Sequence, residues 1–285
     1  MFNTLISVVE LQSLIASGRP VALFDCSFDL ADPAAADRLF AEAHLPSAQQ
    51  AHLDRDLSAH AGDARESGGR HPLPTRAAFA QWIGAHGVGP DTQVVVYERS
   101  GANFCGRLWW MLKWLGHEAI AVLDGGLAAW QAAGGAIERG PAARPVPRRF
   151  EAGEARARLV CTEAVARDLG RPTQTLIDAR APARFRGEVE PLDPVAGHIP
   201  GALNRPFTEN FTPDGRFKPA EQLRAEWTAL LGLRSAPTVV HHCGSGVSAI
   251  PNLLAMEIAG FPRTALYAGS WSEWCNTPGL PVARG

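Results

Sequence analysis

The second half of the chain repeats the first, and this repeat limits the fold more than any other feature of the sequence. Leu23-Phe24-Asp25 matches Leu176-Ile177-Asp178, and Val95-Val96-Tyr97 matches Val239-Val240-His241. Matching residues are 153 or 154 positions apart up to His198 and 144 apart from Val239 on, which indicates one insertion in the first copy. A chain of this kind is expected to fold as two copies of one supersecondary plan.

The two copies are separated by a stretch that is rich in Gly, Pro, Ala and Arg. Within it, Gly140-Pro141 and Arg144-Pro145-Val146-Pro147 cannot continue a helix or a central strand. The length of 285 residues also fits two domains of ordinary size. We therefore expect a first domain over residues 1–138, a linker over 139–157 and a second domain over 158–285.

Within each copy, short apolar runs alternate with helical patterns. Residues 21–25 and 94–97 have the composition of buried strands, whereas 11–17 and 104–115 have the spacing of helices. Ser7-Val8-Val9-Glu10 has the form of a capping box, which marks the start of a helix. The alternation predicts an α/β fold with two tandem domains, each a mainly parallel central sheet flanked by helices.

Composition excludes several classes of function. The formal net charge of -2 gives no indication of contact with nucleic acid or with a membrane surface. No apolar run is long enough to span a bilayer, and the N-terminus lacks the basic start of a signal peptide, so we expect a cytoplasmic protein. The five cysteines are scattered and form no C-x-x-C pair, which argues against a disulfide framework and a zinc site. We expect no metal and no organic cofactor.

The strongest chemical signal lies in residues 238–248. A β-branched run ends at Cys243, and an apolar helical pattern follows from Ala249 to Ile258. The loop between them contains two glycines and two serines, namely Gly244, Ser245, Gly246 and Ser248. A cysteine between a strand end and a helix start meets backbone N–H groups and the positive end of a helix dipole, which together stabilise a thiolate. The sequence therefore predicts Cys243 as a nucleophile, with a buried structural cysteine as the alternative.

Two other cysteine chemistries fit this loop less well. A tyrosine phosphatase needs an arginine to bind the phosphoryl oxygens, and Ala249 occupies the place where that arginine would stand. A Cys–His hydrolase needs a histidine on the sulfur, but His242 points to the opposite face of the strand. In the first copy Arg99 corresponds to Cys243, so we expect only the second domain to react.

The chain resembles the tandem-domain rhodanese family, and within it the 3-mercaptopyruvate sulfurtransferases. The likeness covers nearly the whole chain and is carried by four motifs, Cys243-Gly244-Ser245-Gly246-Val247-Ser248, Arg184-Phe185-Arg186-Gly187, Gly197-His198-Ile199-Pro200-Gly201-Ala202 and Gly269-Ser270-Trp271-Ser272-Glu273-Trp274. It implies transfer of a sulfane sulfur from 3-mercaptopyruvate to a small thiophilic acceptor, cyanide or a thiol, through a Cys243 persulfide. A protein thiol such as thioredoxin is a further acceptor that it allows. The alternatives are a thiosulfate sulfurtransferase and a persulfide carrier without turnover.

The resemblance also assigns roles to individual residues. It implies a catalytic relay of Ser245, His71 and Asp54 that moves a proton as pyruvate enolate leaves. An exposed loop histidine and a helix cap are the alternatives for His71 and Asp54. The substrate would contact the loop at Gly244, Gly246, Val247 and Ser248.

Arg184 matches the family arginine that holds the donor carboxylate, for which a guanidinium fork is well suited. A second arginine is expected near Leu192, but the segment reads Glu190-Pro191-Leu192-Asp193. We expect Arg186 or a residue of the first domain to compensate. The resemblance also implies mercaptopyruvate over thiosulfate as the donor, because the thiosulfate-preferring branch of the family has Arg and Lys in this loop, which would suit a dianion, whereas Gly244 and Ser245 are neutral here.

Overall fold

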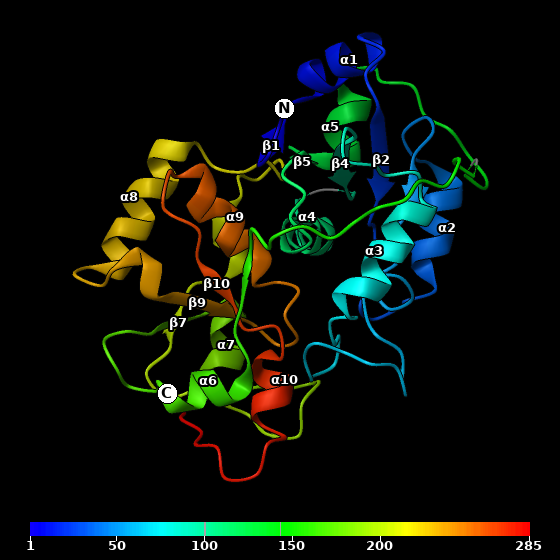
Figure 1. Ribbon diagram of the computed structural model, residues 1–285. Helices are drawn as coiled ribbons and strands as arrows, with labels where there is room; N and C mark the ends of the chain where they lie inside the picture. The colour runs from blue at the N-terminus through cyan, green and yellow to red at the C-terminus, as the bar shows by residue number, and fades with distance from the viewer. Residues whose placement is uncertain (100, 143) are drawn as a thin grey trace. The chain divides into compact units, whose positions relative to one another are not determined.

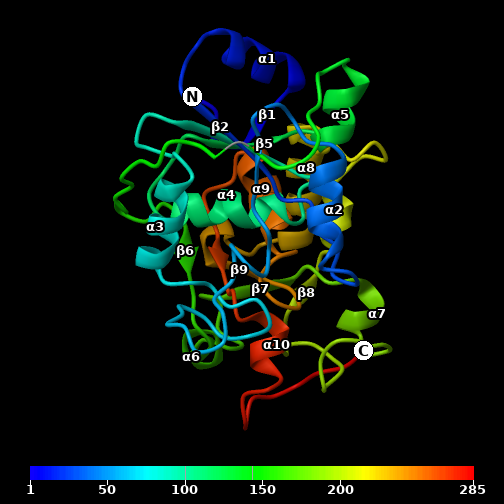
Figure 2. The same ribbon diagram turned by 90° about the vertical axis from the view of Figure 1, so that its right-hand side faces the viewer.

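The structure is a computed structural model that describes residues 1–99, 101–142 and 144–285. By their contacts the residues form two compact units. Unit 1 comprises Met1–Ala64, Pro74–Arg156 and Phe211–Phe217, and unit 2 comprises Arg65–Leu73, Ala157–Asn210 and Lys218–Gly285. Figure 1 and Figure 2 show the helices and strands of both units in two views.

This division differs from the expected domain limits. The expected linker 139–157 is grouped almost entirely with unit 1. The segment Arg65–Leu73 belongs to unit 2, although it lies far before the boundary of the repeat, and Phe211–Phe217 belongs to unit 1. The N–H of Phe217 donates to the carboxylate of Asp124 at 2.9 Å, which ties the latter segment to unit 1. Both segments are short loops, so no hydrophobic period in them indicates which unit they join.

Unit 1 is built on a five-stranded parallel sheet in the order β1-β5-β4-β2-β3. Its strands are β1 (Leu5–Ile6), β2 (Val21–Asp25), β3 (Gln49–Gln50), β4 (Gln93–Tyr97) and β5 (Ile120–Leu123). Its helices are α1 (Val8–Ala16), α2 (Ala35–Glu42), α3 (Arg76–Ala85), α4 (Cys105–Trp114) and α5 (Gly126–Ala132). The capping box before α1 is confirmed, because Ser7 Oγ accepts the N–H of Glu10 and the Glu10 carboxylate accepts the N–H of Ser7.

Unit 2 has the same strand order, β6-β10-β9-β7-β8, and its sheet is also parallel. Its strands are β6 (Arg158–Leu159), β7 (Thr175–Asp178), β8 (Leu203–Asn204), β9 (Val239–His242) and β10 (Ala265–Leu266). Its α-helices are α6 (Thr162–Arg167), α7 (Pro182–Phe185), α8 (Ala220–Leu231), α9 (Ile250–Ile258) and α10 (Ser270–Trp274), and two 3₁₀ turns span Phe207–Asn210 and Ala236–Thr238. The predicted α/β fold with two parallel sheets is thereby confirmed.

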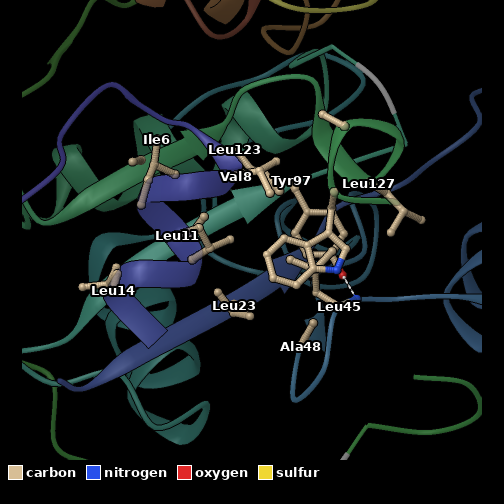
Figure 3. Close-up of a cluster of buried hydrophobic side chains, with 14 of the residues drawn as sticks. Ile6, Val8, Leu11, Leu14, Leu23, Leu45, Ala48, Tyr97, Leu123 and Leu127 are labelled. Carbon is tan, nitrogen blue, oxygen red and sulfur yellow. Dashed lines mark hydrogen bonds between the residues drawn. The ribbon is translucent and has the colours of Figure 1, made fainter. Parts of the chain in front are cut away.

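Alternate residues of the unit 1 strands face opposite sides of the sheet, as strand geometry requires. Leu23 and Tyr97 belong to a buried cluster that includes residues of α1 and α5 (Figure 3). Within it, the Tyr97 hydroxyl accepts the N–H of Leu45 at 2.9 Å, which satisfies the one polar group of a buried ring. On the other side Phe24 contacts Trp82 of α3, with 5.8 Å between ring centroids. Helices therefore cover both faces of the sheet.

Unit 2 repeats this pattern around β9, the strand that leads to Cys243. Val240 packs with residues of α6 and α10 in one cluster, whereas His241 faces Trp227 of α8 with 5.7 Å between ring centroids. All four residues of β9 are buried. Since alternate residues face opposite sides, His242 points away from His241, and the strand end is held rigidly by packing on both faces.

No helix in the part of the chain that the structure describes is both long enough and apolar enough to cross a bilayer.

Candidate functional site

Cys243 lies at the carboxyl end of β9, at the start of the loop that leads into α9. This is the edge of a parallel sheet at which ligands bind in α/β folds. The residue is 2% exposed. Its N–H donates to Ser270 Oγ at 3.1 Å and its carbonyl accepts the N–H of Trp271 at 3.0 Å. These two bonds tie the backbone of Cys243 to the first turn of α10, so the backbone position from which its side chain extends is fixed.

The loop after Cys243 contains backbone N–H groups that make no hydrogen bond to other described residues. Those of Gly244, Ser245, Val247 and Ser248 have no hydrogen-bond partner among the described residues. Gly246 has φ +75°, and a Cβ there would lie 2.3 Å from the carbonyl oxygen of Ala268, so only glycine allows the loop this path. Free N–H groups beside the N-terminus of α9 suit a negatively charged sulfur.

Ser245 and His71 form a direct hydrogen bond. The distance between Ser245 Oγ and His71 Nδ1 is 2.7 Å, and both residues are 6% exposed. His71 lies in Arg65–Leu73, the segment of the first half that belongs to unit 2. The structure thus brings together two of the three residues of the predicted relay, which are 174 positions apart. Asp54 lies in unit 1, where its N–H donates to His52 Nδ1 at 3.2 Å, and its part in the relay stays a prediction.

Arg184 lies on α7 and is 19% exposed in its side chain. Glu190 binds one edge of its guanidinium, with distances of 3.3 Å to Nε and 2.6 Å to Nη2. Asp193 Oδ2 lies 3.5 Å from the same Nη2. The segment in which a second arginine was expected therefore supplies two nearly buried carboxylates that orient Arg184, while Leu192 is 51% exposed.

Arg186 does not join the loop. Its guanidinium faces solvent and binds Glu188 through Nε at 2.6 Å and Nη2 at 3.0 Å. Its carbonyl accepts the N–H of Gly285. The expectation that Arg186 compensates for the missing arginine is thus not supported by the geometry, because its two-pronged pairing with Glu188 directs the side chain to the surface.

A buried ion pair that the sequence pattern did not predict lies next to the site. Arg180 is 3% exposed and binds Asp178 at 2.7 Å, Glu190 at 3.3 Å and the carbonyl of Gly197 at 2.8 Å. Burial alone raises the pKa of Asp178, but the nearby positive charge outweighs burial and holds that pKa below its usual range. Burial also lowers the pKa of the facing His242, which disfavours its charged form, whereas Arg180 keeps its charge at all relevant pH values and stabilises the carboxylate.

Position in the sequence gives some signal for this pair, because Asp178 ends β7 and Arg180 follows at the same sheet edge as Cys243. The guanidinium also lies 4.9 Å from the ring centroid of Trp271. Arg180 therefore links β7, the Glu190 segment and α10, which are the three elements around the loop.

Unit 1 carries different chemistry at the corresponding place. Arg99 replaces the cysteine, and its guanidinium donates to the carbonyl of Leu39. The carboxyl group of Glu98 accepts the N–H groups of Phe104 at 2.6 Å and Cys105 at 2.8 Å, at the start of α4. Burial raises the pKa of Glu98 to about 7. In unit 1 the carboxyl group of Glu98 thus lies in front of the N-terminus of α4, where an anion would otherwise bind.

Among residues 1–99, 101–142 and 144–285, no group of three or more His, Cys, Asp or Glu side chains is placed to hold a metal ion.

Comparisons with known proteins agree with this architecture. Residues 7–133 and 162–277 both match the family model described as rhodanese-like domain. The chain is 48% identical over 264 residues to a probable 3-mercaptopyruvate sulfurtransferase of Pseudomonas aeruginosa, with 92% of each protein covered. It is 39% identical over 286 residues to a putative thiosulfate sulfurtransferase of Mycobacterium tuberculosis, with 99% of this chain and 98% of the relative covered.

A solved structure of a 3-mercaptopyruvate sulfotransferase from Escherichia coli is also similar. It aligns with a TM-score of 0.79 at 31% identity and covers 95% of this chain and 100% of its own. These relatives are named for two different sulfur donors, so the choice of one donor has to come from the residues of the site.

Proposed function

The chain belongs to the rhodanese-like family and is a sulfurtransferase, and on this premise we propose that it takes a sulfane sulfur from 3-mercaptopyruvate onto Cys243. The observation that carries the proposal is the 2.7 Å bond between Ser245 and His71, in a loop of free N–H groups directly after the cysteine. A hydroxyl bonded to a histidine provides a route for a proton, which a carbon leaving group requires and thiosulfate does not.

In the first half-reaction, the Cys243 thiolate attacks the sulfur of the donor. A bond forms between the two sulfur atoms, the bond between carbon and sulfur breaks, and its electron pair remains on the enolate of pyruvate. The proton of the donor thiol passes through Ser245 and His71 to the enolate carbon, which yields pyruvate and the persulfide anion. The free N–H groups of the loop stabilise this anion as they stabilise the thiolate.

In the second half-reaction, a thiophilic acceptor removes the terminal sulfur. Cyanide or a thiolate attacks that sulfur, the bond between the two sulfur atoms breaks, and the electron pair returns to Cys243 as a thiolate. The products are thiocyanate or a new persulfide, so no oxidant or reductant is consumed. A protein thiol such as thioredoxin is a proposed acceptor of the same chemistry, and a cytoplasmic location is proposed with it.

Thiosulfate is the second candidate donor, because a relative that is 39% identical is named as a thiosulfate enzyme. The loop argues against it. Gly244 and Ser245 add no positive charge, and the carboxylates of Glu190 and Asp193 offset the guanidinium of Arg184. A dianion would therefore meet little net attraction at this site.

The experiment compares both donors with cyanide as acceptor and follows pyruvate and thiocyanate in the steady state. We expect a higher kcat/KM with mercaptopyruvate, and mass spectrometry after donor treatment should find one added sulfur on Cys243. Cys243→Ser should lose both the adduct and turnover, whereas Cys161→Ser, which changes an exposed cysteine of the same unit, should keep both.

A single stoichiometric transfer without turnover would indicate a persulfide carrier instead of an enzyme. Full activity in Cys243→Ser would refute the proposed nucleophile.

A further inference from the structure

One residue of α10 binds the backbone on both sides of the relay. The N–H of Ser272 donates to the carbonyl of Gly244 at 2.9 Å, in the loop that carries Ser245. Its side-chain Oγ accepts the N–H of Arg70 at 3.0 Å, in the segment Arg65–Leu73 that carries His71. Ser272 is 6% exposed, so water competes little for either bond.

The hydroxyl of Ser272 has a fixed direction. It donates to the carbonyl of Gly269 at 3.2 Å, which leaves its oxygen to accept the N–H of Arg70. Gly69 lies tightly beside it, because a Cβ there would be 2.7 Å from Ser272 Oγ and 2.6 Å from the carbonyl oxygen of Gly269. The backbone of the segment therefore lies directly against α10 just before His71.

Glu273 contacts the same segment one residue earlier. A Cβ on Gly68 would lie 2.5 Å from Glu273 Oε1, so the carboxylate lies against the backbone of this glycine. Burial raises the pKa of Glu273, and hydrogen bonds from the hydroxyl of Thr162 and the N–H of Gly68 oppose that rise. The carboxylate therefore joins α10 to the segment and to the start of α6.

The segment is also closed on itself at its base. The N–H of Glu66 donates to the carbonyl of Leu73 at 2.9 Å, and the N–H of Leu73 donates to Ser67 Oγ at 2.9 Å. The tip between these ends contains Gly68-Gly69, and two successive glycines leave a backbone a wide choice of conformations. The contacts with α10 restrict that choice directly before the relay histidine.

The helix of unit 1 that corresponds to α10 is α5, and it provides an internal comparison. The N–H groups of Leu127 and Ala128 in α5 donate to two successive loop carbonyls, at 2.9 and 3.1 Å. The start of α10 binds the Cys243 loop in a similar way, through two successive N–H groups at 3.0 and 2.9 Å. Backbone groups thus attach the helix to the neighbouring loop in both units.

The side chains at these helices differ. With the spacing of 144 positions, Ala128 and Ala129 stand where α10 has Ser272 and Glu273. Unit 1 therefore folds around α5 without a hydroxyl or a carboxylate at these two places. The polar pair occurs in the unit that has the cysteine and the relay, and the fold itself does not require it.

We propose that Ser272 and Glu273 are positioning residues for the proton relay, which hold His71 within hydrogen-bond distance of Ser245. This inference rests on the proposed function and names what fixes the geometry of its relay. The two residues act through the backbone of the segment that carries His71. The 2.7 Å distance between Ser245 and His71 thus depends on a helix that binds both the loop and the segment.

The test replaces both side chains with those of unit 1, in Ser272→Ala/Glu273→Ala. With mercaptopyruvate, kcat should fall about 10- to 100-fold, because two contacts to the segment are lost and the proton route is no longer held together. With thiosulfate, kcat should change less than about threefold, since its leaving group takes up no proton. Glu273→Gln keeps an oxygen that can accept the N–H of Gly68, so its kcat should exceed that of Glu273→Ala.

A second measurement separates positioning of the relay from a general structural role. In the Ser245→Ala background the relay is already broken, so the double substitution should lower kcat with mercaptopyruvate by less than about twofold more. A structural role would lower kcat by the same factor in both backgrounds.

Thr277→Ala is the matched control, because its hydroxyl binds the backbone of α10 itself, at 2.8 Å from the carbonyl of Glu273. It should keep the kcat of the unchanged protein with both donors. Urea unfolding checks that each variant is folded, and if the double variant is not, Ser272→Ala alone should show a loss of about 3- to 10-fold with the same dependence on donor and background.

An unchanged kcat in the double variant would overturn the inference. Equal losses with both donors, or the same loss in the Ser245→Ala background, would overturn it as well, while the unchanged protein still forms the persulfide on Cys243. Failure of the unchanged protein to form that persulfide would overturn the proposed function instead.

Discussion

Gly246 offers the sharpest test of how the loop is built. Its φ of +75° lies in the left-handed region, which costs a residue with a side chain about 1 to 2 kcal/mol. A Cβ would also lie 2.3 Å from the carbonyl oxygen of Ala268 and 2.8 Å from its Cα, both of which belong to the backbone. Gly246→Ala must therefore shift the loop or the segment after β10, whichever is less tightly held.

The conformational cost and the displaced contact together should lower the free energy of unfolding by about 2 to 4 kcal/mol. A shift of the loop also misdirects the free N–H groups around the sulfur. Removing one such donor in other enzymes costs about 100-fold or more in kcat, so we expect a loss of at least this size.

Gly244→Ala is the matched comparison in the same loop. Its Cβ would meet only the ends of two flexible side chains, at 3.1 Å for Arg70 and 3.5 Å for Arg184. These side chains can yield, so stability and kcat should change little while KM for mercaptopyruvate rises.

The assay combines urea unfolding of both variants with single-turnover formation of the persulfide. If Gly246→Ala keeps the unfolding midpoint and the rate of the unchanged protein, then the tight loop is not what positions Cys243, and the reasoning is refuted.

Two further predictions concern the relay and unit 1. Ser245→Ala and His71→Gln should each lower kcat about 10- to 100-fold with mercaptopyruvate and much less with thiosulfate. The double variant should have the same kcat as the single variants, because both residues act in one proton route. Equal losses of kcat with both donors would exclude that route. The pKa of Glu98 is raised from 4.5 to about 7 in the folded protein, so the folded state favours the protonated carboxyl group. Its contribution to the free energy of unfolding is therefore full below about pH 4.5 and is lost as the pH rises through about 7. The shift corresponds to a change of about 3 kcal/mol. Glu98→Gln should flatten the fall in urea midpoint between about pH 5 and pH 8, and an unchanged slope would contradict the assignment.

Much of the fold could be predicted from the sequence, because it follows from local patterns. The apolar runs 21–25 and 94–97 became β2 and β4, and the helical pattern from Ala249 became α9. The repeat predicted two copies of one supersecondary plan, and the two sheets indeed have the same strand order. Strand geometry alone predicted that Cys243 lies at the carboxyl edge of its sheet and that His242 points to the opposite face of the strand from Cys243.

The surroundings of Arg184 could not be predicted in the same way. The sequence Glu190-Pro191-Leu192-Asp193 indicated only that an arginine was missing. Whether its carboxylates would face solvent or a guanidinium depends on how the loop packs, and neither spacing nor composition records that. The direction of the Arg186 side chain was equally unpredictable from the sequence, since its ion pair with Glu188 directs it to the surface.

The sequence by itself determined which residue is the nucleophile candidate, because a thiol between a strand and a helix N-terminus is a local arrangement. Only the tertiary structure decided what surrounds it. His71 and Ser245 are 174 positions apart, Arg70 and Asp193 are 123 apart, and each pair exists because a short loop of the first half belongs to unit 2. Contacts of this kind depend on the burial and hydrogen bonding of the whole unit, whose free energy is shared among many residues and is not encoded in any single segment.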